Sequence, residues 1–271
     1  MKEKEMRMFT DPATGKRMTT WNPAFGCLHE CYGGKCWAKK VALEFQARGN
    51  SKYANGFAPG FDPNDSYILG KKHFKVDELV FVVSMGDLFG EWVDPEIIHK
   101  IMIVVRNHPD TTFLLQTKNP SRFAQLIKSD WITANCILGT TLETDNRYDH
   151  LYSTRCPSVI DRYVGLLNTP SRFKRFISIE PIMDFDKTTF IVRLKELSPT
   201  IIEIGADTCG ADLPEPSPEK VHWLIETLKE FVPHVVVKDN LKRLLKERKQ
   251  VTDLIAPHDK RPSRPWLCSM R

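Results

Sequence analysis

The chain of 271 residues is 41% hydrophobic and 27% charged, carries a formal net charge of +5, and is long enough for a large buried core. It contains no run of eighteen apolar residues and no apolar leader pattern near residue 1, so we expect neither a membrane span nor secretion. We therefore expect a cytoplasmic protein, in which thiols stay reduced and seven cysteines favour metal or redox chemistry over disulfides.

The first informative segment, residues 21–38, brings Cys27, Cys31 and Cys36 together among glycines and aromatic residues. Thiolates are the soft ligands that iron–sulfur clusters and zinc prefer. A four-iron cluster with three protein ligands keeps one iron open for a cofactor or a substrate. Because two glycines lie between the second and third cysteine, backbone amides can approach the cluster and donate hydrogen bonds to its sulfurs.

Structural zinc is the alternative interpretation of this segment, with His29 as the fourth ligand. His29 lies between the first two cysteines, a spacing unlike that of common zinc sites, and no second pair of closely spaced ligands follows. The other four cysteines are isolated in the sequence and are expected to be buried or incidental thiols: Cys136, Cys156, Cys209 and Cys268.

Six short apolar runs follow and alternate with amphipathic segments that predict helices. The runs are Leu79–Val83, Thr111–Leu115, Cys136–Gly139, Phe176–Ile179, Ile201–Ile204 and His234–Val237. The helical patterns, each beginning near a proline or a capping residue, are Pro95–Arg106, Pro120–Lys128 and Pro218–Phe231. Because near-continuous apolar strands are typical of parallel sheets buried on both faces, the alternation predicts an α/β protein built from βαβ units.

Polar residues gather where the predicted strands end. These ends hold Ser84–Asp87, Gln116–Lys118, Thr140–Glu143, Glu180, Asp207 and Lys238. Barrels of parallel strands place their active sites at the carboxyl ends of the strands, so these residues predict a functional rim. Capping of the following helix is the alternative role, above all for Asn119 and Ser121.

Two further segments lie outside this pattern. Residues 49–70 are rich in Gly, Asn, Asp and Pro and predict a long loop. Residues 238–264 hold nine Lys or Arg against four Asp or Glu, which favours either nucleic-acid contact or a solvated surface helix at Leu241–Lys249. We expect a barrel over residues 1–240 and a basic C-terminal helix with an extension over residues 241–271.

Several short motifs, taken in order and spacing, resemble the radical S-adenosylmethionine superfamily, and most of all an uncharacterised phage-associated branch of it. They are Trp21–Pro23 with Gly26–Cys27, Cys36–Ala38, Ser84–Phe89, Gln116–Pro120 and Ser178–Pro181. The resemblance extends from about residue 20 to residue 240. The cysteine spacing departs from the common pattern: three and then four residues separate the cysteines here, where three and then two are usual.

The resemblance implies a partial (β/α)6 barrel of the TIM type, with parallel strands and the N-terminal cysteine loop after the first strand. It also implies a [4Fe-4S] cluster on Cys27, Cys31 and Cys36, with S-adenosylmethionine bound to the open iron. An electron from a flavodoxin- or ferredoxin-like donor would cleave this cofactor and release a 5′-deoxyadenosyl radical, which abstracts hydrogen from the substrate.

By the same resemblance, the cofactor contacts come from the strand ends. We expect Ser84, Gly86 and Asp87 at the amino group, Thr117 and Lys118 at the carboxylate or the substrate, Thr140, Thr141 and Glu143 at the ribose, and Glu180 at the ribose or the substrate. Each of these residues also has a structural alternative. Asp87 could cap the following helix, and Glu180 could form an ion pair with a nearby arginine. Lys238 and Asp239 could form an ion pair with each other at the rim of the barrel.

The sequence therefore favours a radical enzyme that cleaves S-adenosylmethionine and acts on an unknown substrate, with a nucleic-acid base as one candidate. One alternative is a non-catalytic binding protein that keeps the barrel and uses zinc or a cluster structurally. Another is a cluster-containing nucleic-acid-binding protein whose cluster senses redox state. Metal content distinguishes these hypotheses in part, because only the enzyme needs a cluster with an open iron.

Overall fold

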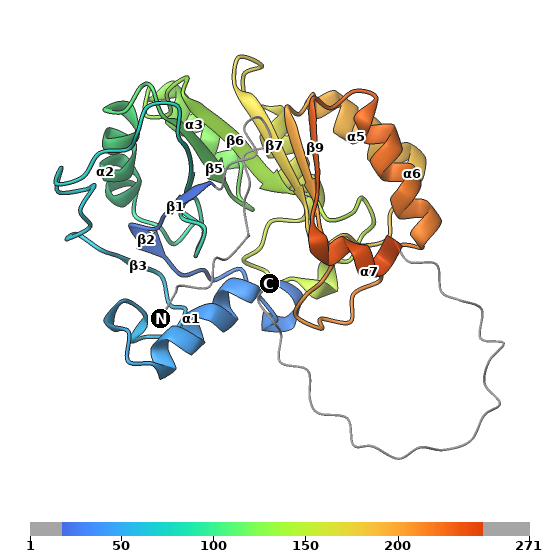
Figure 1. The fold of residues 1–271 in the computed structure, drawn as a ribbon, viewed down its shortest axis with the longest axis horizontal. Coiled ribbons are helices and arrows are strands. Elements are labelled where there is room, and N and C mark those ends of the chain that lie inside the picture. Colours follow the sequence, from blue (N-terminus) through green and yellow to red (C-terminus); the bar gives the residue numbers. More distant parts are fainter. Residues whose placement is uncertain (1–17, 246–271) are drawn as a thin grey trace.

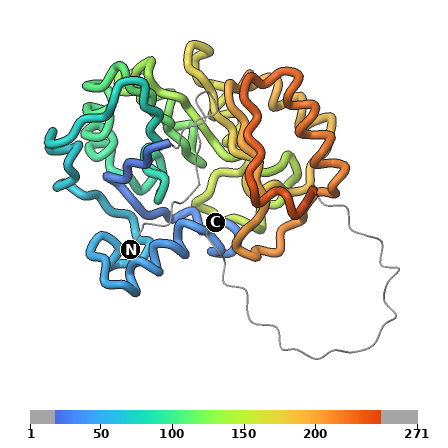
Figure 2. Tube along the Cα trace, in the orientation of Figure 1, coloured from blue at the N-terminus to red at the C-terminus, as the bar shows by residue number. Residues whose placement is uncertain are grey.

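The computed structural model describes residues 18–245 and is built around a seven-stranded parallel sheet (Figure 1). In spatial order its strands are β1 (Thr19–Trp21), β4 (Leu79–Val82), β5 (Thr112–Gln116), β6 (Cys136–Thr141), β7 (Lys174–Ile179), β8 (Ile201–Ile204) and β9 (His234–Val237). The first strand, in blue, and the last, in red, lie apart (Figure 2), and each pairs with one neighbour. The sheet therefore curls into a half-barrel that does not close.

The described helices are α1 (Trp37–Ala47), α2 (Pro95–Arg106), α3 (Ser121–Lys128), α4 (Val159–Leu167), α5 (Lys187–Leu197), α6 (Pro218–Lys229) and α7 (Lys242–Leu245). Helices α2 and α3 cover the outside of the curl at one end, and α5 and α6 cover it at the other (Figure 1). Local signals fix their starts: Pro95 follows the N-cap Asp94 of α2, and Ser158 forms a capping box with Asp161 in α4.

Side chains of each strand alternate between two apolar clusters. On β5, Phe113 and Leu115 belong to the core beneath the outer helices, whereas Leu114 belongs to the cluster inside the barrel. The inner cluster consists of Met18, Phe81, Leu114, Ile137, Phe176 and Ile201, and leaves a cavity of about 10 Å³. Because packed side chains fill the amino half of the interior, polar groups meet at the carboxyl ends of the strands.

The partial barrel and the six predicted strands are confirmed, with β1 added at one edge. The predicted loop at residues 49–70 is more ordered than expected, since it contains the turn η2 (Ser51–Tyr53) and the strand β3 (Gly60–Phe61). Strand β3 pairs antiparallel with β2 (Ala24–Phe25), immediately before the cysteines. The long insertion is therefore folded against the cysteine segment.

After β9 the chain forms the turn η4 (Asp239–Leu241) and the short helix α7, which packs against α6. The structure shows only the start of the helix predicted at Leu241–Lys249, and the rest of it and the extension to residue 271 lie outside the described residues. The division into a barrel and a C-terminal unit therefore stays a prediction. Within residues 18–245, no helix has both the length and the apolar character needed to cross a bilayer.

Candidate functional site

The cysteine segment forms a loop between β2 and α1, beside the carboxyl end of β4. Cys31 begins the 3₁₀ turn η1 (Cys31–Gly34), and Cys36 is the N-cap residue of α1. At this cap the backbone amides of Ala38 and Lys39 face the Cys36 sulfur and oppose the rise in its pKa that burial causes, although they form no capping hydrogen bond with it. The amide of His29 donates to Cys27 Sγ over 3.4 Å. Backbone N–H groups thus already face two of the three thiols.

Two glycines let the loop lie close to β4. The Gly26 amide donates to the Met85 carbonyl over 2.9 Å, and Gly26 pairs in parallel with Gly86. Gly26 has a φ of +81°, and a Cβ on it would lie 2.3 Å from the Ala58 carbonyl oxygen. A Cβ on Gly86 would lie 2.7 Å from the Gly26 oxygen. The predicted site residue Gly86 therefore permits the close approach that seats the loop.

Replacing Gly26 by alanine should lower the free energy of unfolding by about 2–3 kcal/mol, because the left-handed backbone is strained and the new methyl group meets Ala58. Gly33→Ala is the matched control: Gly33 has a φ of +64° but open space around a Cβ, so about 1 kcal/mol is expected. Urea denaturation of both variants measures the difference. Equal losses would contradict the crowding argument.

His29 is buried beneath the loop and uses both ring nitrogens. Its Nε2 lies 2.8 Å from Asp87 Oδ2, and its Nδ1 lies 3.0 Å from the Arg155 carbonyl oxygen. Because both nitrogens face oxygen acceptors, neither directs a lone pair at the cysteines. His29 is therefore unsuited to be a fourth zinc ligand. Among residues 18–245, no group of three or more His, Cys, Asp or Glu side chains is arranged to hold one metal ion.

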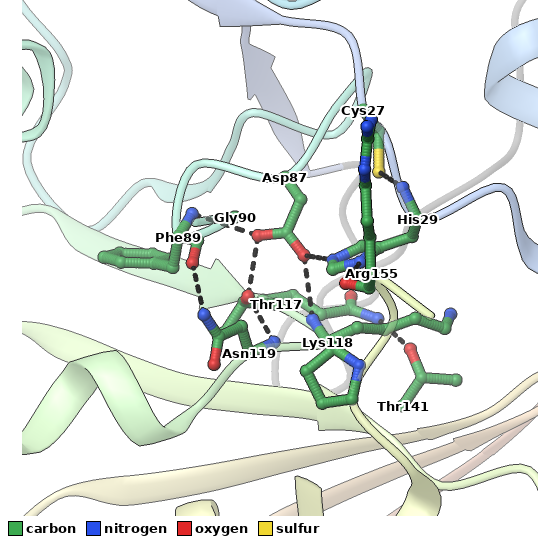
Figure 3. A network of polar contacts seen from close by, with 12 residues as sticks. Cys27, His29, Asp87, Phe89, Gly90, Thr117, Lys118, Asn119, Thr141 and Arg155 are labelled. Atoms are coloured by element: carbon green, nitrogen blue, oxygen red, sulfur yellow. Dashed lines mark hydrogen bonds and ion pairs between the residues drawn. The ribbon is translucent and has the colours of Figure 1, made fainter. Parts of the chain in front are cut away.

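Asp87 ties the same loop to the end of β5 (Figure 3). Its carboxylate faces His29 Nε2 and accepts hydrogen bonds from Thr117 Oγ1 (2.6 Å) and from the amides of Phe89 (3.0 Å) and Lys118 (2.9 Å). Burial opposes ionisation, but the hydrogen bonds, that of His29 above all, hold the pKa of Asp87 below its ordinary value. Four partners occupy its two oxygens, and together they join the loop at His29 to the ends of β4 and β5.

Glu143 is the centre of a second buried network, just beyond β6. Its carboxylate pairs with Arg162 Nη1 (2.7 Å) and Lys118 Nζ (3.4 Å) and accepts a hydrogen bond from the Tyr32 hydroxyl. Burial opposes ionisation of Glu143, but Arg162 and Lys118 hold its pKa below the ordinary value. The Glu143 side chain is fully buried, whereas that of Lys118 is 16% exposed. Glu143 therefore holds Lys118 and Arg162 in one buried network.

Cys156 lies beside Cys31, although its isolated sequence position predicts an incidental thiol. The segment that carries it docks on the cysteine loop, where Ser153 Oγ donates to the His29 carbonyl oxygen over 2.7 Å. A hydrogen bond from the Cys156 thiol, together with the charge of Lys118, lowers the pKa of Cys31 to about 6 against the effect of burial. The candidate site therefore contains four thiols and not three.

The remaining residues predicted near the cofactor also have partners in the protein. Ser84 Oγ donates to Asn22 Oδ1 over 3.2 Å, and Thr140 Oγ1 donates to the Thr117 carbonyl oxygen over 2.6 Å. Thr140 is completely buried on the helix-covered face of β6, whereas Thr141, one residue on, faces the barrel interior. Thr140 therefore joins β6 to β5, and inside the barrel the Thr141 hydroxyl accepts a hydrogen bond from Gln116 Nε2 over 3.1 Å.

Glu180 belongs to a separate polar cluster at the ends of β7, β8 and β9. Lys238 Nζ pairs with Glu180 and with Glu203 Oε1 (2.7 Å), and Asn240 Nδ2 donates to Glu180 Oε1 (2.7 Å). The structural partner of Glu180 is thus a lysine and not the arginine considered from the sequence. Burial raises the pKa of Glu203 to about 7, although Lys238 opposes this.

Glu203 should make stability depend on pH. Its pKa is about 7 in the folded chain and 4.5 ordinarily, so the folded state binds more protons between these values. Stability therefore falls as pH rises from about 4.5 to 7, and Glu203→Gln should remove up to about 3 kcal/mol of that fall. Urea denaturation of both proteins at pH 5 and pH 7 gives the comparison. The same pH dependence in the variant would contradict the assignment.

Solved structures share this fold at low sequence identity. A spore photoproduct lyase mutant with dinucleoside spore photoproduct superposes with a TM-score of 0.56 at 14% identity, covering 80% of this chain and 74% of that one. A double mutant with bound AdoMet and the same dinucleoside has a TM-score of 0.55 at 11% identity, with coverage of 84% and 78%. A third mutant has a TM-score of 0.56 at 12% identity, with coverage of 86% and 79%.

At this identity the likeness establishes the half-barrel fold. No curated protein matches the sequence. The family model described as "Protein of unknown function (DUF5131)" matches residues 16–226, which is most of the chain. The chain therefore belongs to the DUF5131 family.

Proposed function

We propose that this chain is a radical S-adenosylmethionine enzyme whose cysteine loop holds a [4Fe-4S] cluster. The observation that carries the proposal is the position of Cys27, Cys31 and Cys36 on one loop beside the carboxyl ends of β4, β5 and β6. Polar side chains from those strand ends support the loop from below (Figure 3). One solved structure with the same fold is described with bound AdoMet, which supports the choice of cofactor.

The donor set fits a cluster better than a single ion. A zinc ion holds all its ligands about 2.3 Å or less from one point. The described His, Cys, Asp and Glu residues do not converge in threes on such a point. A cluster takes one thiolate at each of three separate irons, which suits thiols spread along a loop, and backbone amides can donate to its sulfurs. When bound, this group would supply one electron to the sulfonium of the cofactor.

We assign the predicted residues two kinds of role. For contact with the cofactor we propose Lys118 at the carboxylate, the backbone around Ser84 and Gly86 at the amino group, and Thr141 and Glu180 at the ribose. For support we propose Asp87, Thr117, Thr140 and Glu143, because their polar atoms already bind other parts of the site. These supports would hold the contact residues rigid and exclude water from the reacting centre.

For the substrate we propose a base within a nucleic acid. Two observations support this choice: the net charge of +5, which attracts phosphate backbones, and the dinucleoside in structures with the same fold. The barrel interior next to Lys238 offers both carboxylates and a cation, which suit the donors and acceptors on a base edge. A flavodoxin- or ferredoxin-like protein is proposed as the electron donor.

Anaerobic purification and metal analysis test the proposal. We expect about four irons and four sulfides per chain, and little zinc. Reduction by dithionite in the presence of S-adenosylmethionine should then form 5′-deoxyadenosine, measured by liquid chromatography. A single-stranded oligonucleotide should raise the yield if a nucleic acid is the substrate.

Three outcomes would count against parts of this proposal. One zinc per chain without sulfide would support the non-catalytic binding protein. A full cluster that leaves S-adenosylmethionine intact would retain the cluster and remove the enzyme. Formation of 5′-deoxyadenosine that no oligonucleotide changes would retain the enzyme and remove the nucleic-acid substrate.

A further inference from the structure

A hollow of about 360 Å³ lies outside the barrel, next to the cysteine segment. Residues of the 51–63 segment line it together with Phe25 of β2, and among the described residues none from the seven-stranded sheet contributes. Its volume is typical of concave binding sites. Ala58 and Pro59 on its wall are exposed to solvent. The hollow is therefore a concave surface separate from the carboxyl ends of the barrel strands.

The wall of this hollow lies directly against the first cysteine. The Cys27 amide donates to the Phe57 carbonyl oxygen over 3.2 Å, and a Cβ on Gly26 would lie 2.3 Å from the Ala58 carbonyl oxygen. Phe57 also packs against the small apolar cluster that Cys36 borders. One stretch of backbone therefore separates the hollow from the cysteine loop, and a hydrogen bond joins this stretch to Cys27.

The segment next to the hollow is strongly basic. Within residues 35–52 the one carboxylate is Glu44, and it pairs with Arg48 over 3.8 Å. The described residues that line the hollow include one cation and one carboxylate, Lys52 and Asp62, and Lys52 Nζ lies over the Phe25 ring at 5.2 Å. The excess positive charge therefore comes from α1 and the turn before it. The cations of residues 35–52 are Lys35, Lys39, Lys40, Arg48 and Lys52.

Helix geometry directs part of this charge toward the hollow. Lys39 and Lys40 precede Leu43 by four and three residues, so all three lie on one side of α1. Leu43 contacts the wall of the hollow, because its Cδ2 lies 3.3 Å from the position of a Cβ on Gly56. The hollow therefore has a positive rim on its α1 side, which favours an acidic partner.

The proposed chemistry needs a route for electrons into the protein. Each electron given to a sulfonium must be replaced by one from outside, while the proposed cofactor and substrate occupy the carboxyl ends of the strands. We propose that the hollow and its basic rim are the docking surface of an acidic protein that carries a one-electron reductant, an inference that rests on the proposed function. One electron leaves this donor and reduces the cluster, and no covalent bond forms or breaks. The hydrogen bond between Cys27 and Phe57 provides a short path between the two.

A nucleic acid would also be attracted by these cations. The hollow, however, lies behind Cys27 and not at the strand ends, where a substrate base would react. A strand bound in the hollow would therefore lie away from the reacting centre. The same position suits a donor, because electron transfer needs proximity to the cluster and not access to the barrel interior.

Stopped-flow reduction of the reconstituted full-length protein tests the inference, with fully reduced flavodoxin as an acidic protein donor and dithionite as a small one. Lys39→Glu/Lys40→Glu reverses the charge of the rim, and Ala58→Trp fills the hollow. Flavodoxin should reduce both variants about tenfold more slowly than wild type, whereas dithionite should reduce them at nearly the wild-type rate. Higher salt should slow the reaction of wild type with flavodoxin and narrow its difference from the lysine variant.

Matched controls carry the same changes in other elements. Lys128→Glu/Lys229→Glu alters the net charge equally at the C-terminal ends of α3 and α6, and Ala134→Trp adds the same ring at an exposed position between α3 and β6. Both reagents should reduce these controls at nearly the wild-type rate. Calorimetry with oxidised flavodoxin, which transfers no electron, should show weaker binding for the two test variants alone.

Iron and sulfide are counted on every sample so that the outcomes remain distinct. Reduction of both test variants by flavodoxin at the wild-type rate would overturn the inference and leave the proposed function standing, and so would a wild-type cluster that only dithionite reduces. Equal slowing with dithionite would place the effect on the cluster and not on docking, which also overturns it. Loss of oligonucleotide affinity with donor reduction intact would assign the surface to a nucleic acid instead. Wild-type protein that assembles no cluster would overturn the inference and the proposed function together.

Discussion

Replacing Cys27, Cys31 or Cys36 by alanine should reduce the iron content of the reconstituted protein from about four per chain to below one. Each of these thiols is expected to hold a separate iron, and residues 18–245 contain no group of three or more His, Cys, Asp or Glu side chains that could hold the iron instead as a single ion. A cluster with two anchors would be exposed to solvent and lost. Iron and sulfide assays after anaerobic gel filtration measure the effect, and 5′-deoxyadenosine formation should disappear with the iron.

Cys136→Ala and Cys209→Ala provide the controls for this series. Cys136 is buried on β6 and Cys209 is half-buried after β8, and we assign neither of them to the cluster. Both variants should keep full iron, and circular dichroism verifies that every variant is folded. Full iron in the three loop variants, or equal losses in loop variants and controls, would disprove the assignment of the cluster.

The strands were predictable because a parallel sheet covered on both sides needs apolar side chains at nearly every position. Ile201–Ile204 and His234–Val237 match β8 and β9 end to end. Strand β1 is different, since Thr19–Trp21 has three residues and little apolar character. Its extended conformation depends on pairing with β4, some sixty residues later, which no local pattern records.

The site was predictable only in part, for a related reason. Spacing identifies the cysteine loop, and the strand ends identify Asp87 and Lys118 as polar residues near it. A sequence pattern does not reveal which partner satisfies a buried group, so it missed Arg162, which pairs with Glu143, and Cys156, whose thiol affects the pKa of Cys31. One usable signal was present in Ile201–Ile204. Side chains of a strand alternate between the two faces of the sheet, so Glu203 could have been predicted to face the barrel interior.

Replacing Arg162 by methionine should lower the free energy of unfolding by about 3–5 kcal/mol, the usual cost of removing one partner of a buried ion pair. Methionine has a similar length and cannot donate. Glu143 would keep only Lys118, at 3.4 Å, and the Tyr32 hydroxyl around a fully buried carboxylate. The carbonyl oxygen of Thr141 would also lose its guanidinium donor. Urea denaturation at neutral pH measures the loss.

The matched control is Arg172→Met, because Arg172 is exposed and lies over the Phe173 ring at 4.9 Å. This variant should lose less than about 0.5 kcal/mol. Combining Arg162→Met with Glu143→Gln removes the carboxylate that the first change leaves with Lys118 as its one cation, so the double variant should lose less than the sum of the two single losses. Additive losses, or a loss for Arg162→Met no larger than that for Arg172→Met, would show that Glu143 does not depend on Arg162.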